Sequence, residues 1–297
     1  MELTEPKPKR NFKIHMNTSL PIVLKKDGSL HEMTGTFNEF SVLVECEADA
    51  KNLISRGYFG KANLSRSYPQ FVTKPELLRK RQFQTRTNIS TSLSLVNNIK
   101  IIPDKVIVVP DSESDDEYFT NVKPVYHMDN SSLREKLWLS LEEAFFLASA
   151  LKCLTVYFND KKLSLKDMWK LFSKQHYFVR NYIVYFYYRS KNWIVKPGIK
   201  FGGDFLLYKQ GPPFYHASYV VIIEVIKGEE DSDKSARNID LFGLNRLCET
   251  AAKELIICKL FWAKENEVDF SDLSSIKILE ILVRRWNPTQ ERLGIPK

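Results

Sequence analysis

The chain contains only four cysteines among its 297 residues, and no two of them form a C-x-x-C pair. Cys46, Cys153, Cys248 and Cys258 stand singly within apolar segments, without the spacing of a zinc site or the density of a disulfide scaffold. We therefore expect all four to be small core residues of a protein kept in a reducing compartment.

Long apolar runs are also missing. No stretch approaches the roughly 18 to 20 apolar residues that a membrane-spanning helix needs, and the opening residues MELTEPKPKR contain no apolar signal core. We expect neither a membrane span nor secretion. Hydrophobic residues still make up 43% of the chain, which is enough for a soluble globular protein of about two domains.

Positive charge exceeds negative charge. The formal net charge is +8, and it rises to +13 when the five acidic residues between 111 and 117 are left out. A basic excess of this kind suits a polyanionic partner such as nucleic acid. Charge alone does not decide the matter, because most surface lysines are simply solvated.

We expect four regions along the chain. We expect a basic flexible tail at 1–18 and an N-terminal domain formed by 19–72 and 132–174. Residues 73–131 form an insertion that includes the acidic, apolar-poor linker 110–117. Residues 175–297 form a second domain.

Periodicity and capping residues predict the secondary structure. Ser140 with Glu143 is a capping box, and Ser164 is a second helix N-cap. Helices are expected at 48–56, 141–152, 165–173, 178–191 and 241–260, and strands at 20–24, 37–45, 200–208, 216–226 and 276–285.

The predicted order of helices and strands is typical of an α+β fold, in which a small N-terminal α/β domain precedes a domain with a mixed sheet flanked by helices. The run from 216 to 226 has too many consecutive apolar residues for a half-exposed strand, so we expect it in the centre of a sheet. The aromatic stripe of the 178–191 helix should pack in the core.

A phenol and an imidazole flank a tight turn in the second domain. Tyr208 and His216 are eight positions apart, and Gly211-Pro212-Pro213 lies between them. Because the turn reverses the chain, both side chains can lie at one end of adjacent strands. An imidazole titrates near neutrality, whereas a phenol acts as a base only with help, and a nearby cation could supply that help.

Lys253 is the candidate cation. If 241–260 is one amphipathic helix, Lys253 points away from the stripe of Leu247, Ala251 and Leu255 that should face the core. Arg246 lies seven residues earlier and should project from the same face. Taken singly, each of these residues has an ordinary structural explanation.

The segment around the turn resembles the catalytic subunits of the tRNA-splicing endonuclease, most closely those that cut the 5′ splice site. The string GPPFYHASYVVIIE at 211–224 is long and unusual. Further similar stretches lie at 58–67, 139–146 and 188–193, whereas 73–130 matches poorly.

The resemblance implies a tRNA-intron endonuclease domain of the restriction-endonuclease-like kind, which cleaves RNA without a metal or other cofactor. It implies Tyr208 as general base, His216 as general acid and Lys253 as electrostatic stabiliser. It also implies that Arg246 and Trp286 grip a bulged RNA base at the other catalytic subunit's site, since unpaired bases are commonly held by stacking.

The same resemblance implies partners and a location. The substrate would be intron-containing pre-tRNA, and the assembly would be a heterotetramer with a second catalytic subunit for the 3′ splice site and two structural subunits. A nuclear location is expected, with a cytoplasmic one also open.

Three other functions compete with this one. A metal-dependent nuclease could use Asp204, but Glu224-Val225-Ile226 has isoleucine where its Glu-x-Lys motif needs lysine. A noncatalytic structural subunit of the same complex would not need Tyr208, His216 and Lys253 together. A plain RNA-binding module would bind tRNA without cutting it.

Overall fold

The computed structural model describes residues 20–22, 28, 30–62, 106–109, 125–128, 136–226, 241–262, 270, 273 and 276–284. The chain divides into two compact units, residues 1–62 with 136–297 and residues 63–135. In the second unit, β4 (Val106–Val109) pairs antiparallel with β5 (Val125–Met128). The predicted tail 1–18 and acidic linker 110–117 lie outside the described residues.

The first unit contains two mixed sheets. The first, called the N-terminal sheet, has six strands in the order β3-β6-β2-β1-β7-β8, and only β1 and β7 pair in parallel among them. Its strands are β1 (Met33–Phe37), β2 (Val42–Val44), β3 (Lys61–Ala62), β6 (Leu137–Leu139), β7 (Leu154–Phe158) and β8 (Lys161–Lys162).

Three helices accompany the N-terminal sheet: α1 (Glu47–Ser55), α4 (Leu141–Ser149) and α5 (Leu165–Phe172). Both predicted N-caps are present. Ser140 and Glu143 form a reciprocal capping box at α4, and Ser164 forms another with Asp167 at α5. These caps satisfy amide groups that a helix leaves unpaired in its first turn, which is why the two starts could be predicted.

The second sheet, called the C-terminal sheet, has five strands in the order β13-β12-β11-β10-β9. Its central pair, β11 and β12, is parallel over eight residues, and the other pairs are antiparallel. The strands are β9 (Ile194–Pro197), β10 (Phe205–Tyr208), β11 (Tyr219–Ile226), β12 (Glu254–Phe261) and β13 (Lys277–Val283).

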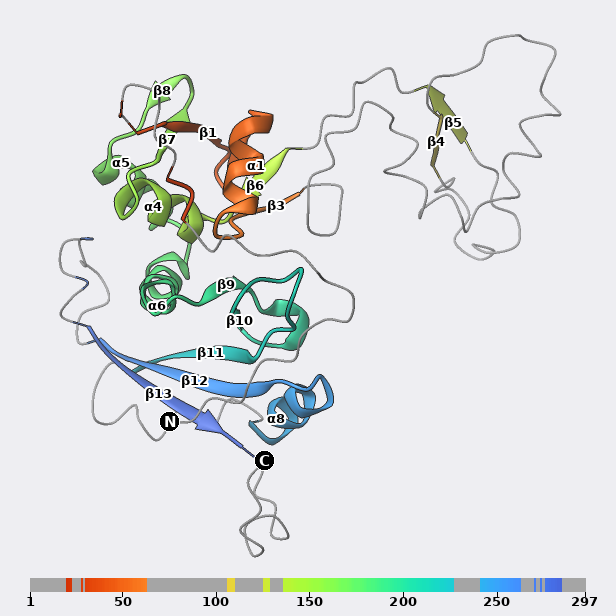
Figure 1. Cartoon of the computed structure of the whole chain (residues 1–297), viewed down its shortest axis with the longest axis vertical. Helices are drawn as coiled ribbons and strands as arrows, with labels where there is room; N and C mark the ends of the chain where they lie inside the picture. Colours follow the sequence, from red (N-terminus) through yellow and green to blue (C-terminus); the bar gives the residue numbers. More distant parts are fainter. Residues whose placement is uncertain are drawn as a thin grey trace, which may run out of the picture. The chain divides into compact units, whose positions relative to one another are not determined.

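Helices cover both faces of the C-terminal sheet (Figure 1). Phe205 of β10 packs against Tyr185 of α6 (Phe178–Ser190), with ring centroids 6.2 Å apart. The next residue, Leu206, points to the opposite face and joins a buried cluster with Cys248 of α8 (Leu241–Thr250). Burial from both sides explains the almost continuous apolar sequence of β11, which is central in the sheet as predicted.

Several predictions agree closely with the structure. The expected helices 48–56, 165–173 and 178–191 correspond to α1, α5 and α6, and each differs by one residue at one or both ends. The 178–191 stripe is largely buried, with Tyr182 at 3% exposure and Arg189 at 9%, but Phe186 is 43% exposed.

Other predictions were wrong. Residues 20–22 form no strand, and residues 23–24 of that expected strand lie outside the described residues. The expected strand 37–45 is interrupted: Phe37 ends β1, residues 38–41 connect the strands, and only Val42–Val44 form β2. The expected strand 200–208 begins only at Phe205, because residues 199–201 form a short 3-10 helix. Cys46 is exposed at the start of α1, unlike the buried Cys153, Cys248 and Cys258. Within the described residues, no helix has the length and apolarity to cross a membrane.

The predicted helix 241–260 is the largest error. It ends at Thr250, and residues 254–261 form β12 instead. Ala252 has a left-handed backbone with φ of 53°, which no continuing helix could contain. Ile256 and Ile257 are β-branched residues that fit a central strand, and pairing with β11 outweighs local helix propensity.

Candidate active site

The backbone brings the positions of Tyr208, His216 and Lys253 to one end of the C-terminal sheet. Ser218 N–H donates to the carbonyl of Leu207, which directly precedes Tyr208, at 2.9 Å. The carbonyl of Ser218 accepts from the N–H of Glu254, which directly follows Lys253, at 3.0 Å. His216 lies two residues before this shared partner.

The turn that carries His216 is closed by its own backbone. The Gly211 carbonyl accepts from the N–H groups of Phe214 and Tyr215, at 3.2 and 3.1 Å. Gly211 has φ of 112°, in the region that L-residues rarely adopt, so glycine is required here. The expected strand 216–226 begins only at Tyr219, and His216 is therefore an exposed residue of the turn.

Lys253 lies in the connection between α8 and β12, and not on a helix as predicted. Its N–H donates to the carbonyl of Cys248 at 2.9 Å, which closes the helix end after the left-handed Ala252. The predicted core stripe does not form one helical face, because Leu247 is 44% exposed and Leu255 is buried in β12. Lys253 nevertheless reaches the sheet end through this connection.

The Lys253 ammonium is half-buried against an aromatic ring. Its Nζ lies 4.3 Å from the centroid of Phe201 and donates to the carbonyl of Ala251 at 2.9 Å. Burial lowers the pKa of Lys253; Cys248 opposes this, and repulsion from Lys200 lowers the pKa further. The site therefore concentrates positive charge.

Lys200 and Phe201 were not predicted as site residues. The Lys200 Nζ lies 5.9 Å from the same ring centroid that Lys253 contacts, so one ring faces two ammonium groups. Both residues belong to the 3-10 helix Ile199–Phe201, and Phe201 contacts Lys253 of the α8 to β12 connection. The one sequence signal for Lys200 and Phe201 is that they lie in the segment directly before Tyr208.

Tyr208 packs against the buried cluster that includes Ala217 and Cys248. Burial raises the pKa of the Tyr208 phenol, so the phenol is neutral in the free protein at neutral pH. The help that the Lys253 cation could give to this phenol during the reaction stays a prediction. The Lys253 ammonium is directed to the Ala251 carbonyl and the Phe201 ring.

The two carboxylates considered for a metal nuclease have cationic partners. Asp204 pairs with Arg180 at 2.8 Å and accepts the Ile223 N–H at 2.8 Å. Glu224 lies 3.5 Å from the Lys259 ammonium. No three His, Cys, Asp or Glu side chains gather at a metal-binding distance within the described part of the chain.

The two predicted base-gripping residues differ in status. Arg246 is an exposed residue of α8, four residues before its end at Thr250. Because Lys253 is not on that helix, the shared helical face inferred for the two residues does not exist. Trp286 lies outside the described residues.

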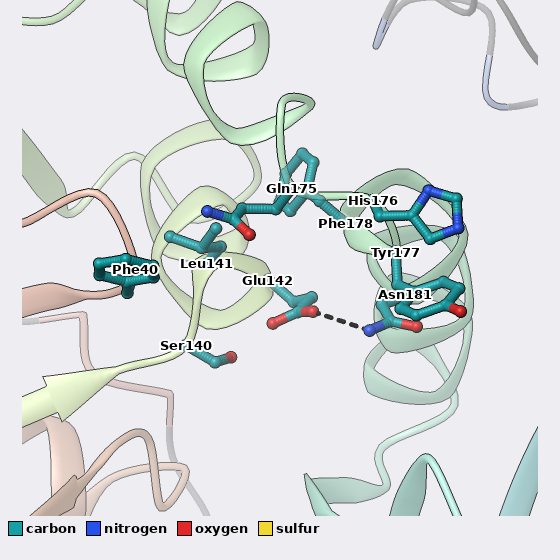
Figure 2. Close-up of a pocket in the computed structure, with 9 residues that line it drawn as sticks. All are labelled: Phe40, Ser140, Leu141, Glu142, Gln175, His176, Tyr177, Phe178 and Asn181. Carbon is teal, nitrogen blue, oxygen red and sulfur yellow. Dashed lines mark hydrogen bonds between the residues drawn. The ribbon is translucent and has the colours of Figure 1, made fainter.

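A surface pocket of about 290 Å³ lies away from Tyr208, His216 and Lys253, at the first turns of α4 and α6 (Figure 2). The Glu142 carboxylate accepts from the Asn181 amide at 3.2 Å, and burial raises the pKa of Glu142. The lining residues are Phe40, Ser140, Leu141, Glu142, Gln175, His176, Tyr177, Phe178 and Asn181. None of the predicted site residues is among them.

Comparison with known proteins gives the family of this arrangement. Residues 178–270 match the family model described as tRNA intron endonuclease, catalytic C-terminal domain. The matched range contains Tyr208, His216, Arg246 and Lys253. The chain is also 32% identical over 168 residues to the tRNA-splicing endonuclease subunit Sen2-1 of Arabidopsis thaliana, a match that covers 54% of this chain and 68% of that protein.

The chain belongs to the Sen2 family of tRNA-splicing endonuclease subunits. Sen2 of Gallus gallus is 44% identical over 167 residues, covering 53% of this chain and 36% of the chicken protein. A probable Sen2 of Schizosaccharomyces pombe is 26% identical over 334 residues, covering 89% of this chain and 86% of the yeast protein.

The match to the vertebrate Sen2 proteins is partial. The chain spans 36% of the chicken protein, 40% of the rat protein and 36% of the mouse protein. The matches establish family membership and a domain of the catalytic type.

Proposed function

We propose that this chain cuts the 5′ splice site of intron-containing pre-tRNA within a tRNA-splicing endonuclease. The observation that carries the proposal is the convergence of Tyr208, His216 and Lys253 on one sheet end through their shared neighbour Ser218. Membership of the Sen2 family supports the same reading.

The proposed reaction needs no metal. The 2′-hydroxyl beside the scissile phosphate loses its proton to Tyr208 and forms a new bond to phosphorus. The bond from phosphorus to the 5′-oxygen breaks, and that oxygen takes a proton from His216. The products are a 2′,3′-cyclic phosphate and a 5′-hydroxyl.

Lys253 has the electrostatic role. Charge accumulates on the phosphate oxygens as the new bond forms, and an ammonium held in a partly buried site stabilises that charge more than one in bulk water. Because Tyr208 is neutral in the free protein, its phenol proton must first pass to solvent, and the phenolate can then take the 2′-hydroxyl proton. An anionic substrate would turn the Lys253 ammonium away from the Ala251 carbonyl and toward the phosphate.

We further propose the assembly and domain plan that the family resemblance implies. The partners are a second catalytic subunit for the 3′ splice site and two structural subunits, and the location is nuclear. Strand β13 is at one edge of the C-terminal sheet, and its Leu279 is 46% exposed. An edge strand has unpaired backbone groups, so β13 could pair with a strand of a partner subunit. Residues 19–72 with 132–174 form the N-terminal domain, and 175–297 form a restriction-endonuclease-like catalytic domain.

Arg246 and Trp286 are proposed to sandwich a bulged base at the partner's site. The exposure of Arg246 on α8 leaves its guanidinium available for stacking. This role makes the residue important for the cut that the other catalytic subunit performs.

The test is end-group analysis of pre-tRNA after incubation with the assembled complex, with and without EDTA. We expect a cyclic phosphate at the 5′ splice site in both conditions, and His216→Ala should abolish that cut while leaving tRNA affinity intact. His176→Ala is the matched control, because His176 is also an exposed histidine but lies at the start of α6.

Each competing function has its own outcome in this experiment. Loss of the cut in EDTA would indicate a metal-dependent nuclease. Normal 5′ cleavage by the His216→Ala complex would indicate a structural subunit, and loss of tRNA binding without a selective cleavage defect would indicate an RNA-binding module.

A further inference from the structure

The segment Gly57-Tyr58-Phe59-Gly60 has an unusual backbone. Three of its four residues have left-handed φ angles: 91° at Gly57, 59° at Tyr58 and 76° at Gly60. Glycine adopts this region freely, but a tyrosine there carries a strain of about 1 to 2 kcal/mol. Such a conformation persists only where surrounding contacts impose it.

Arg189 of α6 holds one end of this segment. Its Nη1 donates to the Gly57 carbonyl at 3.2 Å, and its guanidinium lies 4.3 Å from the centroid of the Phe59 ring. Arg189 is only 9% exposed and Phe59 only 1%. The arginine therefore acts from inside the protein as a fixed support.

A buried ion pair holds the other end. Lys196 of β9 donates to the Gly60 carbonyl at 2.9 Å, and Glu143 of α4 accepts the Gly60 N–H at 3.1 Å. The two charged groups also pair with each other at 3.0 Å. Both backbone groups of Gly60 are thus fixed by side chains from two different elements.

Held at both ends, the segment presses the Tyr58 ring against the turn that carries His216. A Cβ atom added to Gly211 would lie 2.5 Å from Cε2 of Tyr58, 2.7 Å from Cζ and 2.9 Å from Cδ2. The ring therefore touches the Gly211 backbone directly, with no room for even a methyl group. Burial raises the pKa of the Tyr58 phenol to about 12, so this ring stays neutral.

We propose that Tyr58 is a positioning residue that holds the Gly211 turn, and through it His216, in the geometry for cleavage. The inference rests on the proposed function and adds a role for the N-terminal part of the chain. Gly211 accepts the hydrogen bonds that close the turn, so a shift of Gly211 moves the five residues leading to His216. The atoms nearest Gly211 in this contact are carbons of the Tyr58 ring.

A misplaced general acid slows the chemical step without weakening substrate binding. Displacements of about 1 Å can cost on the order of 100-fold in rate. Tyr58→Ala should therefore lower the rate of 5′ cleavage at saturating complex by roughly 10- to 100-fold. The half-saturating concentration should stay unchanged, because the proposed role of Tyr58 is to hold the turn and not to bind RNA.

The experiment measures single-turnover cleavage of pre-tRNA by the assembled complex at both splice sites. The 3′ cut is an internal control, since the other catalytic subunit makes it. Tyr58→Phe keeps the ring and should cleave within about twofold of wild type at both sites. Tyr58→Leu keeps most of the side-chain volume and replaces Tyr58→Ala if that chain does not assemble.

Phe37→Ala is the matched control for general destabilisation. Phe37 is 6% exposed, and its ring packs against Phe158 of β7 and Phe172 of α5, with ring centroids 5.4 and 5.0 Å away. The Phe37→Ala substitution removes a buried ring from the same part of the chain but does not alter the contact with Gly211. We expect Phe37→Ala to leave the ratio of 5′ to 3′ cleavage unchanged, whereas Tyr58→Ala lowers it.

Two results would overturn the inference. The first is an unchanged ratio of the two cuts in Tyr58→Ala, and the second is an equal loss in Tyr58→Phe, which would assign the effect to the hydroxyl. If the wild-type complex itself fails to form a cyclic phosphate at the 5′ splice site, the proposed function fails, and the two failures are thereby distinguished.

Discussion

Replacing Lys196 with methionine should strongly destabilise the first unit. The substitution keeps an unbranched apolar side chain of similar length but removes the charge that neutralises Glu143, which is 5% exposed. It also leaves the Gly60 carbonyl without its Lys196 donor. The buried carboxylate then loses its cation and keeps only backbone donors.

The contacts that Glu143 keeps determine the size of this effect. Breaking a buried ion pair costs about 3 to 5 kcal/mol. Glu143 still accepts from the N–H groups of Ser140 and Gly60, both at 3.1 Å, so we expect the lower end of about 3 kcal/mol. For a unit of this size, each kcal/mol lowers the melting temperature by about 2 to 4 °C, giving a loss of about 6 to 12 °C.

The assay is thermal unfolding followed by circular dichroism, with two comparison variants. Lys162→Met is the matched control, because Lys162 pairs with Glu32 at 3.2 Å in a bridge whose side chains are 61% and 54% exposed. Such a surface pair contributes about 0 to 1 kcal/mol. Lys196→Met combined with Glu143→Gln removes both charges while keeping a polar cap for α4.

The double variant should recover about 1 to 2 kcal/mol relative to Lys196→Met, since no charge remains buried without a partner. The reasoning is refuted if Lys196→Met costs no more than Lys162→Met. It is also refuted if the two substitutions add with no recovery, because the carboxylate charge would then not be the source of the loss.

Three further predictions concern single residues. Lys200→Gln should raise the pKa of Lys253, because it removes the repulsion between the two ammonium groups. The rate of 5′ cleavage should fall at alkaline pH, where Lys253 loses its charge, and this fall should move to higher pH in the variant. Cleavage rates measured between about pH 8 and 11 check this. Arg246→Ala should slow the 3′ cut more than the 5′ cut, whereas equal slowing would remove the proposed role across the interface. Ser140→Ala should cost about 1 kcal/mol through the lost N-cap of α4, measured by urea unfolding, and an unchanged midpoint would contradict it.

Local signals were sufficient where the structure depends on local interactions. The capping boxes at Ser140 and Ser164 are complete within four residues, so sequence alone could place the starts of α4 and α5. The long apolar run of β11 likewise predicted a strand covered on both faces. Tyr208 and His216 could be singled out because one short turn joins them.

Distant pairing was the part that local signals could not supply. Residues 254–261 form a strand because they pair in parallel with β11, and the local sequence around them does not predict this pairing. Strand β9 and strand β7 were missed for a similar reason, since each is short and depends on neighbours far along the chain. The contact of Tyr58 with Gly211 spans more than 150 positions, so only the folded chain reveals it.

The uneven exposure of the cysteines provides a handle for spectroscopy. Burial raises the pKa of Cys153 to about 11 and that of Cys258 to about 12, and it also raises the pKa of Cys248, so these thiols resist maleimide reagents. Cys46 is exposed, and its side chain makes no capping hydrogen bond at the start of α1. A single fluorophore can therefore be attached there without mutating the chain, and its emission would report changes around the start of α1 when the proposed partners or pre-tRNA are added.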